Sequence, residues 1–166
     1  MPARFFVAER LLMTLWVGAL WAIGYLAVPV LFHSLERQVA GEIAGTMFSI
    51  VSGIGLFCGV ILLWGVLGHL GRAALGQWRF WLLAGMWVIV LVGAVVLQPM
   101  MQDLKEQGLS PGSAVTADFG RLHGISSGLY MVTSLGGLIL VVFGVYPPSS
   151  ASVTLRSFDD DRREGT

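Results

Sequence analysis

Polar and apolar positions are sharply segregated along the 166-residue chain. Four long intervals contain no Asp, Glu, Lys or Arg: residues 11–35, 43–71, 80–102 and 122–155. A helix needs about 20 apolar residues to cross roughly 30 Å of hydrocarbon, and each interval is long enough to supply them. The pattern therefore predicts an all-α, polytopic membrane protein, a bundle of four transmembrane helices at about 11–32, 44–70, 80–98 and 118–146.

The composition agrees with a membrane protein. Hydrophobic residues make up 55% of the chain and charged residues only 12%, whereas soluble domains carry about 25% charged residues. The formal net charge is zero, and nucleic-acid binding needs a clustered basic surface. We therefore expect the lipid bilayer as a partner, with a membrane protein or a second copy of the chain as a further one, and no nucleic acid.

Short connections between the predicted helices leave one transmembrane domain at 1–146 and a polar C-terminal tail at 147–166, which we expect to be disordered. The first interval is too long for a typical signal-peptide core, so a retained helix is expected. A turn or a short surface helix is predicted at 33–42, and a loop at 69–79. In the third loop an amphipathic helical continuation is closed by Gly108, and the last helix begins near Ser113.

The distribution of basic residues predicts an orientation. The N-terminal segment, the second loop and the tail hold seven of the ten Lys and Arg residues, and the first and third loops hold three. Cytoplasmic loops are enriched in Lys and Arg. The count predicts a multi-pass protein of the inner (plasma) membrane with both termini in the cytoplasm.

Residues 119–130, at the start of the fourth helix, bring hydroxyl groups, a histidine and several glycines into the apolar part. At about 100° per residue, two neighbouring stripes form on this helix. The polar stripe holds His123, Ser127, Tyr130 and Ser134, and the small-residue stripe holds Gly120, Gly124 and Gly128. Small residues let helices approach closely in lipid. The pattern predicts that this helix is the hub of the bundle.

Two prolines mark the ends of the first and third helices, which exit on the same side of the membrane. Pro29 and Pro99 each remove a backbone donor, so a kink and a carbonyl in need of another partner are expected. On the predicted topology a polar cluster gathers at this outer end, and ionisable groups at such depth suggest function. Its candidate residues are His123, Arg121, Ser127, Gln98, Asp118, Pro29 and Pro99.

His123 has two interpretations. A neutral histidine at this depth can ligate haem or copper, with His33 as a second ligand, or relay a proton. Alternatively, its imidazole hydrogen-bonds a carbonyl freed by a proline and only fixes the last helix in place. No HxxxH, CxxC or Glu-x-x-His spacing accompanies it. Asp118 and Arg121, three residues apart, can form an interfacial ion pair on one helical face.

Several segments resemble a known family when taken in order. They are residues 16–21 with 29–32, residues 40–41 with 47–48, residues 98–101, and residues 119–126 (Phe-Gly-Arg-Leu-His-Gly-Ile-Ser). This combination resembles the bacterial domain of unknown function 4149 family, related to eukaryotic transmembrane protein 205. Relatives often carry an asparagine shortly after the Leu-His-x-x-Ser pattern, where this chain has Gly128, Leu129 and Tyr130. The resemblance implies a four-helix membrane protein without an established activity.

Three functions stay open from the sequence. The leading one is a small integral membrane protein of non-enzymatic type, which acts through partner association or by handling a small ligand at the outer polar cluster. The second is a membrane redox protein with haem or copper at His123 and His33. The third is a transporter or channel, which would need an oligomer because four mostly apolar helices leave little room for a polar pathway.

Overall fold

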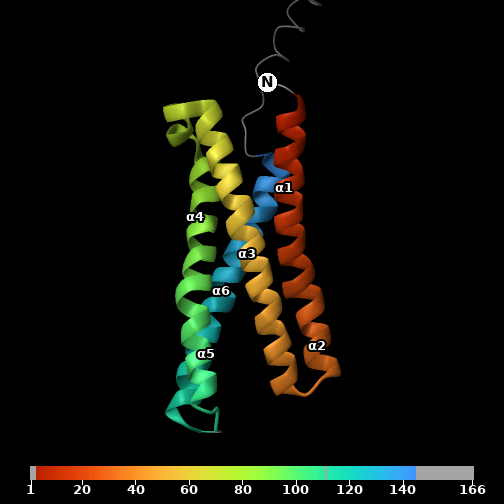
Figure 1. Ribbon diagram of the computed structural model, residues 1–166, viewed down its shortest axis with the longest axis vertical. Coiled ribbons are helices and arrows are strands. Elements are labelled where there is room, and N and C mark those ends of the chain that lie inside the picture. The colour runs from red at the N-terminus through yellow and green to blue at the C-terminus, as the bar shows by residue number, and fades with distance from the viewer. Residues whose placement is uncertain (1–2, 111, 145–166) are drawn as a thin grey trace, which may run out of the picture.

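The computed structural model describes residues 3–110 and 112–144, and within these residues the chain is helical and contains no strand (Figure 1). Four stretches are long and apolar enough to cross a membrane: Val7–Ser34, Arg37–Gly76, Trp78–Glu106 and Ala114–Phe143. The prediction of an all-α protein with four membrane-spanning helices is thereby confirmed.

The first and third spans are built alike, each as an α-helix interrupted by a short π-helix. The first runs through α1 (Ala3–Trp21), η1 (Ala22–Ala27) and α2 (Val28–Ser34), and the third through α4 (Trp78–Val92), η3 (Gly93–Leu97) and α5 (Gln98–Glu106). The second span is α3 (Arg37–Leu70), followed by the 3₁₀ helix η2 (Gly71–Gly76), and the fourth is α6 (Ala114–Phe143).

The predicted spans at 11–32, 44–70 and 80–98 lie inside these longer helices. Of the fourth, residues 118–143 are helical, whereas residues 145–146 and the tail at 147–166 lie outside the described residues. The first connection is shorter than the predicted one at 33–42. Helix α3 begins at Arg37, so that only a two-residue link remains at 35–36. Ala40 and Ala44 are buried one helical turn apart, so packing extends α3 into the segment expected as a turn or surface helix.

Two features of the third connection follow the sequence closely. Gly108 has a φ of 89°, a left-handed conformation that suits glycine after a helix end. Ser113 has an extended backbone, and its side chain accepts a hydrogen bond from the Thr116 backbone N–H at 3.2 Å. This is a side-chain N-cap of α6, and it lies at the helix start that the sequence predicts near Ser113.

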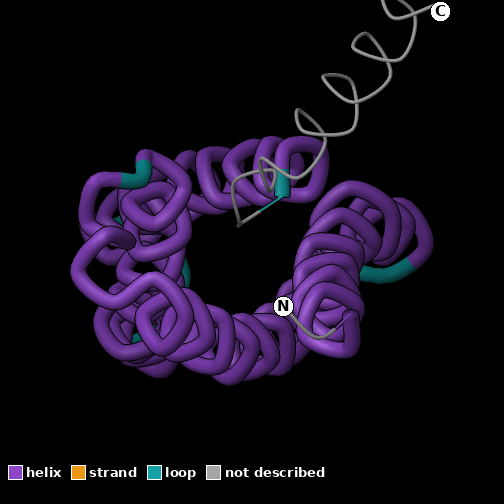
Figure 2. The backbone as a smooth tube through the Cα atoms, turned by 90° about the horizontal axis from the view of Figure 1, so that it is seen from above, coloured by secondary structure: helices purple, strands orange, loops and turns teal. Residues whose placement is uncertain are grey.

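The four spans form a ring in which each packs against two antiparallel neighbours, in the order α1, α3, α4, α6 (Figure 2). We call the end where α1 begins and α6 ends the terminal end. The opposite end holds the 35–36 link and the loop residues 107–110 and 112–113, and we call it the distal end (Figure 1). At the distal end α2 packs against α3, and α5 packs against α6.

The core occupies the terminal half and depends on large side chains set against glycine. Trp16 of α1 is fully buried against Gly55, where an added Cβ would lie 2.5 Å from its indole nitrogen. Gly59 lies against Trp87, whose indole N–H donates to the Leu56 carbonyl at 3.1 Å. Small residues in lipid permit this close approach. The GxxxG at 55–59 is therefore used for packing within the chain.

The predicted glycine stripe at the start of α6 is corrected by the structure. No atom outside the local helix lies within 4 Å of a Cβ built at Gly120, Gly124 or Gly128. The close contacts of α6 occur further along, where Gly136 lies against Met86 and Gly137 against Val17. Helices at the terminal end converge on a common core, so glycine is needed there and the earlier stripe faces open space.

Candidate functional site

The predicted site residues all lie on the distal halves of their helices. Pro29 and His33 are on α2, Gln98 and Pro99 start α5, and the others occupy the first half of α6. Among them, Asp118 and Arg121 line a groove between α5 and α6, Gln98 makes a polar contact to α3, and His123 is exposed. The distal end is therefore the region to search for chemistry.

The groove lies where one face of α5 meets one face of α6. Its α5 residues recur at the i, i+3, i+4, i+7 spacing and its α6 residues at i, i+3, i+4, which places each set on a single helical stripe. The volume is about 420 Å³, and the lining residues are Met100, Asp103, Leu104, Gln107, Asp118, Arg121 and Leu122. The groove combines apolar and charged groups in one place.

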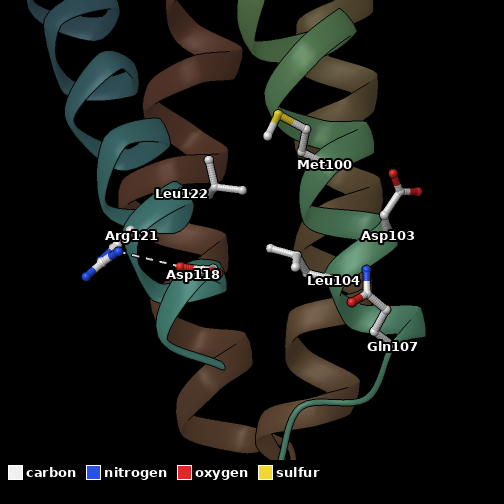
Figure 3. A pocket seen from close by; sticks show the side chains of 7 residues that line it. All are labelled: Met100, Asp103, Leu104, Gln107, Asp118, Arg121 and Leu122. Carbon is white, nitrogen blue, oxygen red and sulfur yellow. Dashed lines mark ion pairs between the residues drawn. The ribbon is translucent and has the colours of Figure 1, made fainter. Parts of the chain in front are cut away.

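Figure 3 shows how these groups are arranged. Leu104 and Leu122 point toward one another across the groove, and Met100 points into the same space (Figure 3). Asp103 lies on the outer side of α5, and Asp118 lies across the groove on α6 (Figure 3). The floor is thus apolar and the rim polar, an arrangement that suits a molecule with an apolar body and a polar head.

Charges on the rim are unevenly paired. Arg121 Nη1 lies 3.6 Å from Asp118 Oδ1, and the side chains are 80% and 58% exposed, so the pair contributes well under about 1 kcal/mol to stability. The predicted Asp118–Arg121 pair on one face of the helix is present. Asp103 makes no ion pair within the described residues.

Lys105 is on the same helix as Asp103, but its side chain contacts the two neighbouring spans, α3 and α6. Its ammonium nitrogen lies 3.5 Å from the Gly41 carbonyl oxygen and 6.0 Å from the centre of the Phe119 ring. A carbonyl oxygen and an aromatic face both attract a cation. The positive charge of Lys105 is therefore engaged with α3 and α6, and Lys105 is not among the residues that line the groove.

His123 is exposed and its ring stacks on Phe119, with 6.0 Å between the ring centres. Its backbone carbonyl accepts a hydrogen bond from the Ser127 hydroxyl at 2.8 Å, so the Ser127 side chain is hydrogen-bonded within α6. Within the described residues the imidazole makes no hydrogen bond. The structure therefore gives no support to the interpretation that His123 fixes α6 to a freed carbonyl.

A contact to the first span is made instead by Tyr130, about two helical turns beyond His123 on the predicted polar stripe, although to a carbonyl nine residues before Pro29 and not to one freed by a proline. Its hydroxyl donates to the Leu20 carbonyl oxygen and is hydrogen-bonded by the Gly24 backbone N–H. In a regular α-helix these two backbone groups would bond to each other, and η1 separates them. Its ring lies against Gly24, where no side chain would fit. The π-helix thus opens a place in the first span for a side chain of the fourth.

Three further polar groups strengthen this junction. The Tyr25 hydroxyl lies 2.7 Å from the Ser134 Oγ, and the Trp21 indole N–H donates to the Ser134 carbonyl at 3.3 Å. Site prediction from sequence missed Tyr25 and Trp21, although the polar stripe contained both of their α6 partners, Tyr130 and Ser134. Because backbone polar groups in lipid must be satisfied within the protein, these contacts are structural anchors.

The second π-helix, η3, has the same relation to proline as the first. Pro29 and Pro99 each lie two residues after a π-helix, and the residue before each proline bonds back five residues, Val28 to Ile23 and Gln98 to Gly93. Beside η3 the Gln98 Oε1 accepts a hydrogen bond from the Ser49 hydroxyl at 3.0 Å. The kinks predicted at the prolines therefore take the form of wide turns just before them.

A metal site needs several ligands in one place. Within residues 3–110 and 112–144 there is no group of three or more His, Cys, Asp or Glu side chains that could hold a metal ion. His33 is the penultimate residue of α2, whereas His123 lies about 13 Å of helix rise beyond the start of α6. Haem or copper at these two histidines stays a prediction.

Comparison with known proteins gives a family and no function. Residues 11–110 match the family described as Domain of unknown function (DUF4149). No curated protein and no solved structure matches the chain. The matched segment includes the first span from residue 11 onward, the second and third spans and both π-helices, and it ends before α6. Because this segment covers more than half of the 166 residues, the chain belongs to the DUF4149 family.

Proposed function

We propose that this chain is a non-enzymatic membrane protein that binds a small amphipathic ligand in the α5–α6 groove at its distal end. The observation that carries the proposal is the groove itself, about 420 Å³ in volume, with leucine and methionine at its floor and Asp103, Asp118 and Arg121 at its rim. Its place at the end of two membrane-spanning helices puts the rim near the headgroup region and the floor toward hydrocarbon.

The floor offers a binding test because two leucines face each other across it. Replacing Leu122 with tryptophan would fill the space opposite Leu104 (Figure 3). We expect the affinity for amphipathic ligands to fall by about tenfold or more, because one anchor pocket of this kind is worth on the order of 1.4 kcal/mol or more. Ligand displacement from protein in lipid nanodiscs, measured with an environment-sensitive alkyl dye, checks this.

Ile125 provides the matched control. It is on the same helix, 55% exposed, and outside the groove. Ile125→Trp adds the same side chain to the membrane surface and should leave ligand binding unchanged. Equal affinities of the wild type, Leu122→Trp and Ile125→Trp would refute binding in the groove.

We also propose the inner membrane as the location, with both termini in the cytoplasm and the distal end on the outer side. The support is the distribution of Lys and Arg, seven at the terminal side and three at the distal side. A relation to eukaryotic transmembrane protein 205 is proposed on the ordered motifs described above, including residues 119–126.

Cysteine labelling in intact cells tests the orientation. The chain has one cysteine, Cys58, which is buried in α3 and supplies a low background. A cell-impermeant maleimide should label Leu109→Cys, at the exposed distal loop, in intact cells. Ser157→Cys, in the C-terminal tail, should react only after lysis. The reverse pattern would overturn the proposed orientation.

A further inference from the structure

The charges around the α5–α6 groove indicate which ligands it accepts. Two carboxylates and one guanidinium line the groove. The guanidinium of Arg121 is paired with Asp118 at 3.6 Å, both on α6. Asp103 is the remaining charge, since it has no ion-pair partner within the described residues. The lining therefore carries one uncompensated negative charge at its α5 side.

The nearest basic side chain on α5 does not neutralise this charge. Lys105 Nζ lies against the Gly41 carbonyl and the Phe119 ring, toward α3 and α6. Asp103 is exposed and is one of the residues that line the groove. Its carboxylate lies on the side of α5 that is turned away from Leu122 (Figure 3). The Asp103 carboxylate and the Lys105 ammonium of α5 therefore lie on different sides of the helix.

We propose, resting on the proposed function, that the ligand of the groove is a cationic amphiphile. Its alkyl or aromatic body lies on Met100, Leu104 and Leu122, and its ammonium or guanidinium head lies beside the Asp103 carboxylate. Charge complementarity selects the cation, because two carboxylates and one guanidinium line the groove and an anionic head would meet this net negative charge. The apolar floor selects against small hydrophilic cations.

Three ligands with the same dodecyl chain separate charge from chain length. Dodecyltrimethylammonium, dodecylphosphocholine and dodecyl sulfate are titrated against the full chain in phosphatidylcholine nanodiscs, with empty nanodiscs subtracted. We expect the cation to bind about five- to tenfold more tightly than the sulfate at low ionic strength, the size of one partly screened charge contact. The difference should shrink as salt is added.

Two substitutions on the rim should change this preference in opposite ways. Asp103→Asn removes the unpaired charge and should lower the affinity for the cation about fivefold. Asp118→Asn frees the Arg121 guanidinium and should raise the affinity for dodecyl sulfate. Glu106→Gln is the matched control, since Glu106 is an exposed acidic residue of α5 that does not line the groove, and it should leave the preference unchanged.

The outcomes separate the two proposals. Tighter binding of the cation that depends on Asp103 and not on Glu106 supports a cationic ligand. Saturable binding that Leu122→Trp weakens about tenfold or more, but that is equal for all three head groups or strongest for the sulfate, overturns the cationic ligand and keeps the groove. Saturable binding that Leu122→Trp leaves unchanged, or no saturable binding of any dodecyl compound, overturns the proposed function as well.

Discussion

Replacement of Gly55 by leucine is expected to lower the free energy of unfolding by about 3 kcal/mol or more, because overpacking at a rigid contact is strongly destabilising. Even a Cβ at this position would lie 2.5 Å from the Trp16 indole nitrogen and 3.0 Å from Cε2. Trp16 is fully buried in the core cluster, so its ring has no free space to move into. Thermal unfolding and SDS titration in mixed micelles measure the loss.

Gly53→Leu is the matched control on the same helix. No atom outside the local helix lies within 4 Å of a Cβ at Gly53, which is exposed. Loss of glycine in a helix interior gains up to about 1 kcal/mol, so Gly53→Leu should be neutral or slightly stabilising. If both variants unfold alike, the packing of α1 on α3 through Trp16 and Gly55 is wrong.

Truncation of Tyr130 to alanine is expected to have the second large effect, a loss of about 3 kcal/mol in unfolding free energy. The change removes the ring that contacts Phe48 edge-on at 5.1 Å and Tyr25 at 6.3 Å. It also removes the hydroxyl that satisfies the Leu20 carbonyl beside η1. The same unfolding measurements in micelles or bicelles check the loss.

Tyr130→Phe isolates the hydroxyl and should cost about 1 kcal/mol, the size of an interhelical hydrogen bond in a membrane protein. Tyr25→Phe should cost less, because the Ser134 hydroxyl keeps its 3.0 Å bond to the Met131 carbonyl. A Tyr130→Phe variant no less stable than Tyr25→Phe would contradict the role of Tyr130 at the π-helix.

The four spans could be predicted because membrane helices leave a one-dimensional signature, the intervals without charge. The start of α3 could not be predicted in the same way. Residues 37–43 are polar enough for a loop and are helical because Ala40 and Ala44 are buried against the rest of the bundle. In the same way, the glycines that α6 uses for packing depend on where the helices converge. Spacing alone does not distinguish Gly124 from Gly137.

The candidate site was predictable in part. Sequence reasoning located the distal end and the Asp118–Arg121 pair, because both follow from helix order and residue spacing. It predicted the helical continuation that ends at Gly108 but missed that this segment, α5, packs beside α6, so the groove lined by Leu104 and Leu122 was not foreseen. It also placed His123 at the centre, whereas Tyr130 makes the contact to a backbone carbonyl of the first span, that of Leu20.

Photolabelling tests most directly whether a cationic amphiphile binds in the α5–α6 groove. An alkyltrimethylammonium probe with a diazirine in its chain is irradiated with the full chain in phosphatidylcholine nanodiscs, and the labelled residues are identified by mass spectrometry. We predict saturable labelling confined to residues 100–107 and 118–122, abolished by excess dodecyltrimethylammonium. Labelling spread over the exposed apolar face of α3, at Phe57, Ile61 and Trp64, and not reduced by competitor, would contradict a ligand site in the groove.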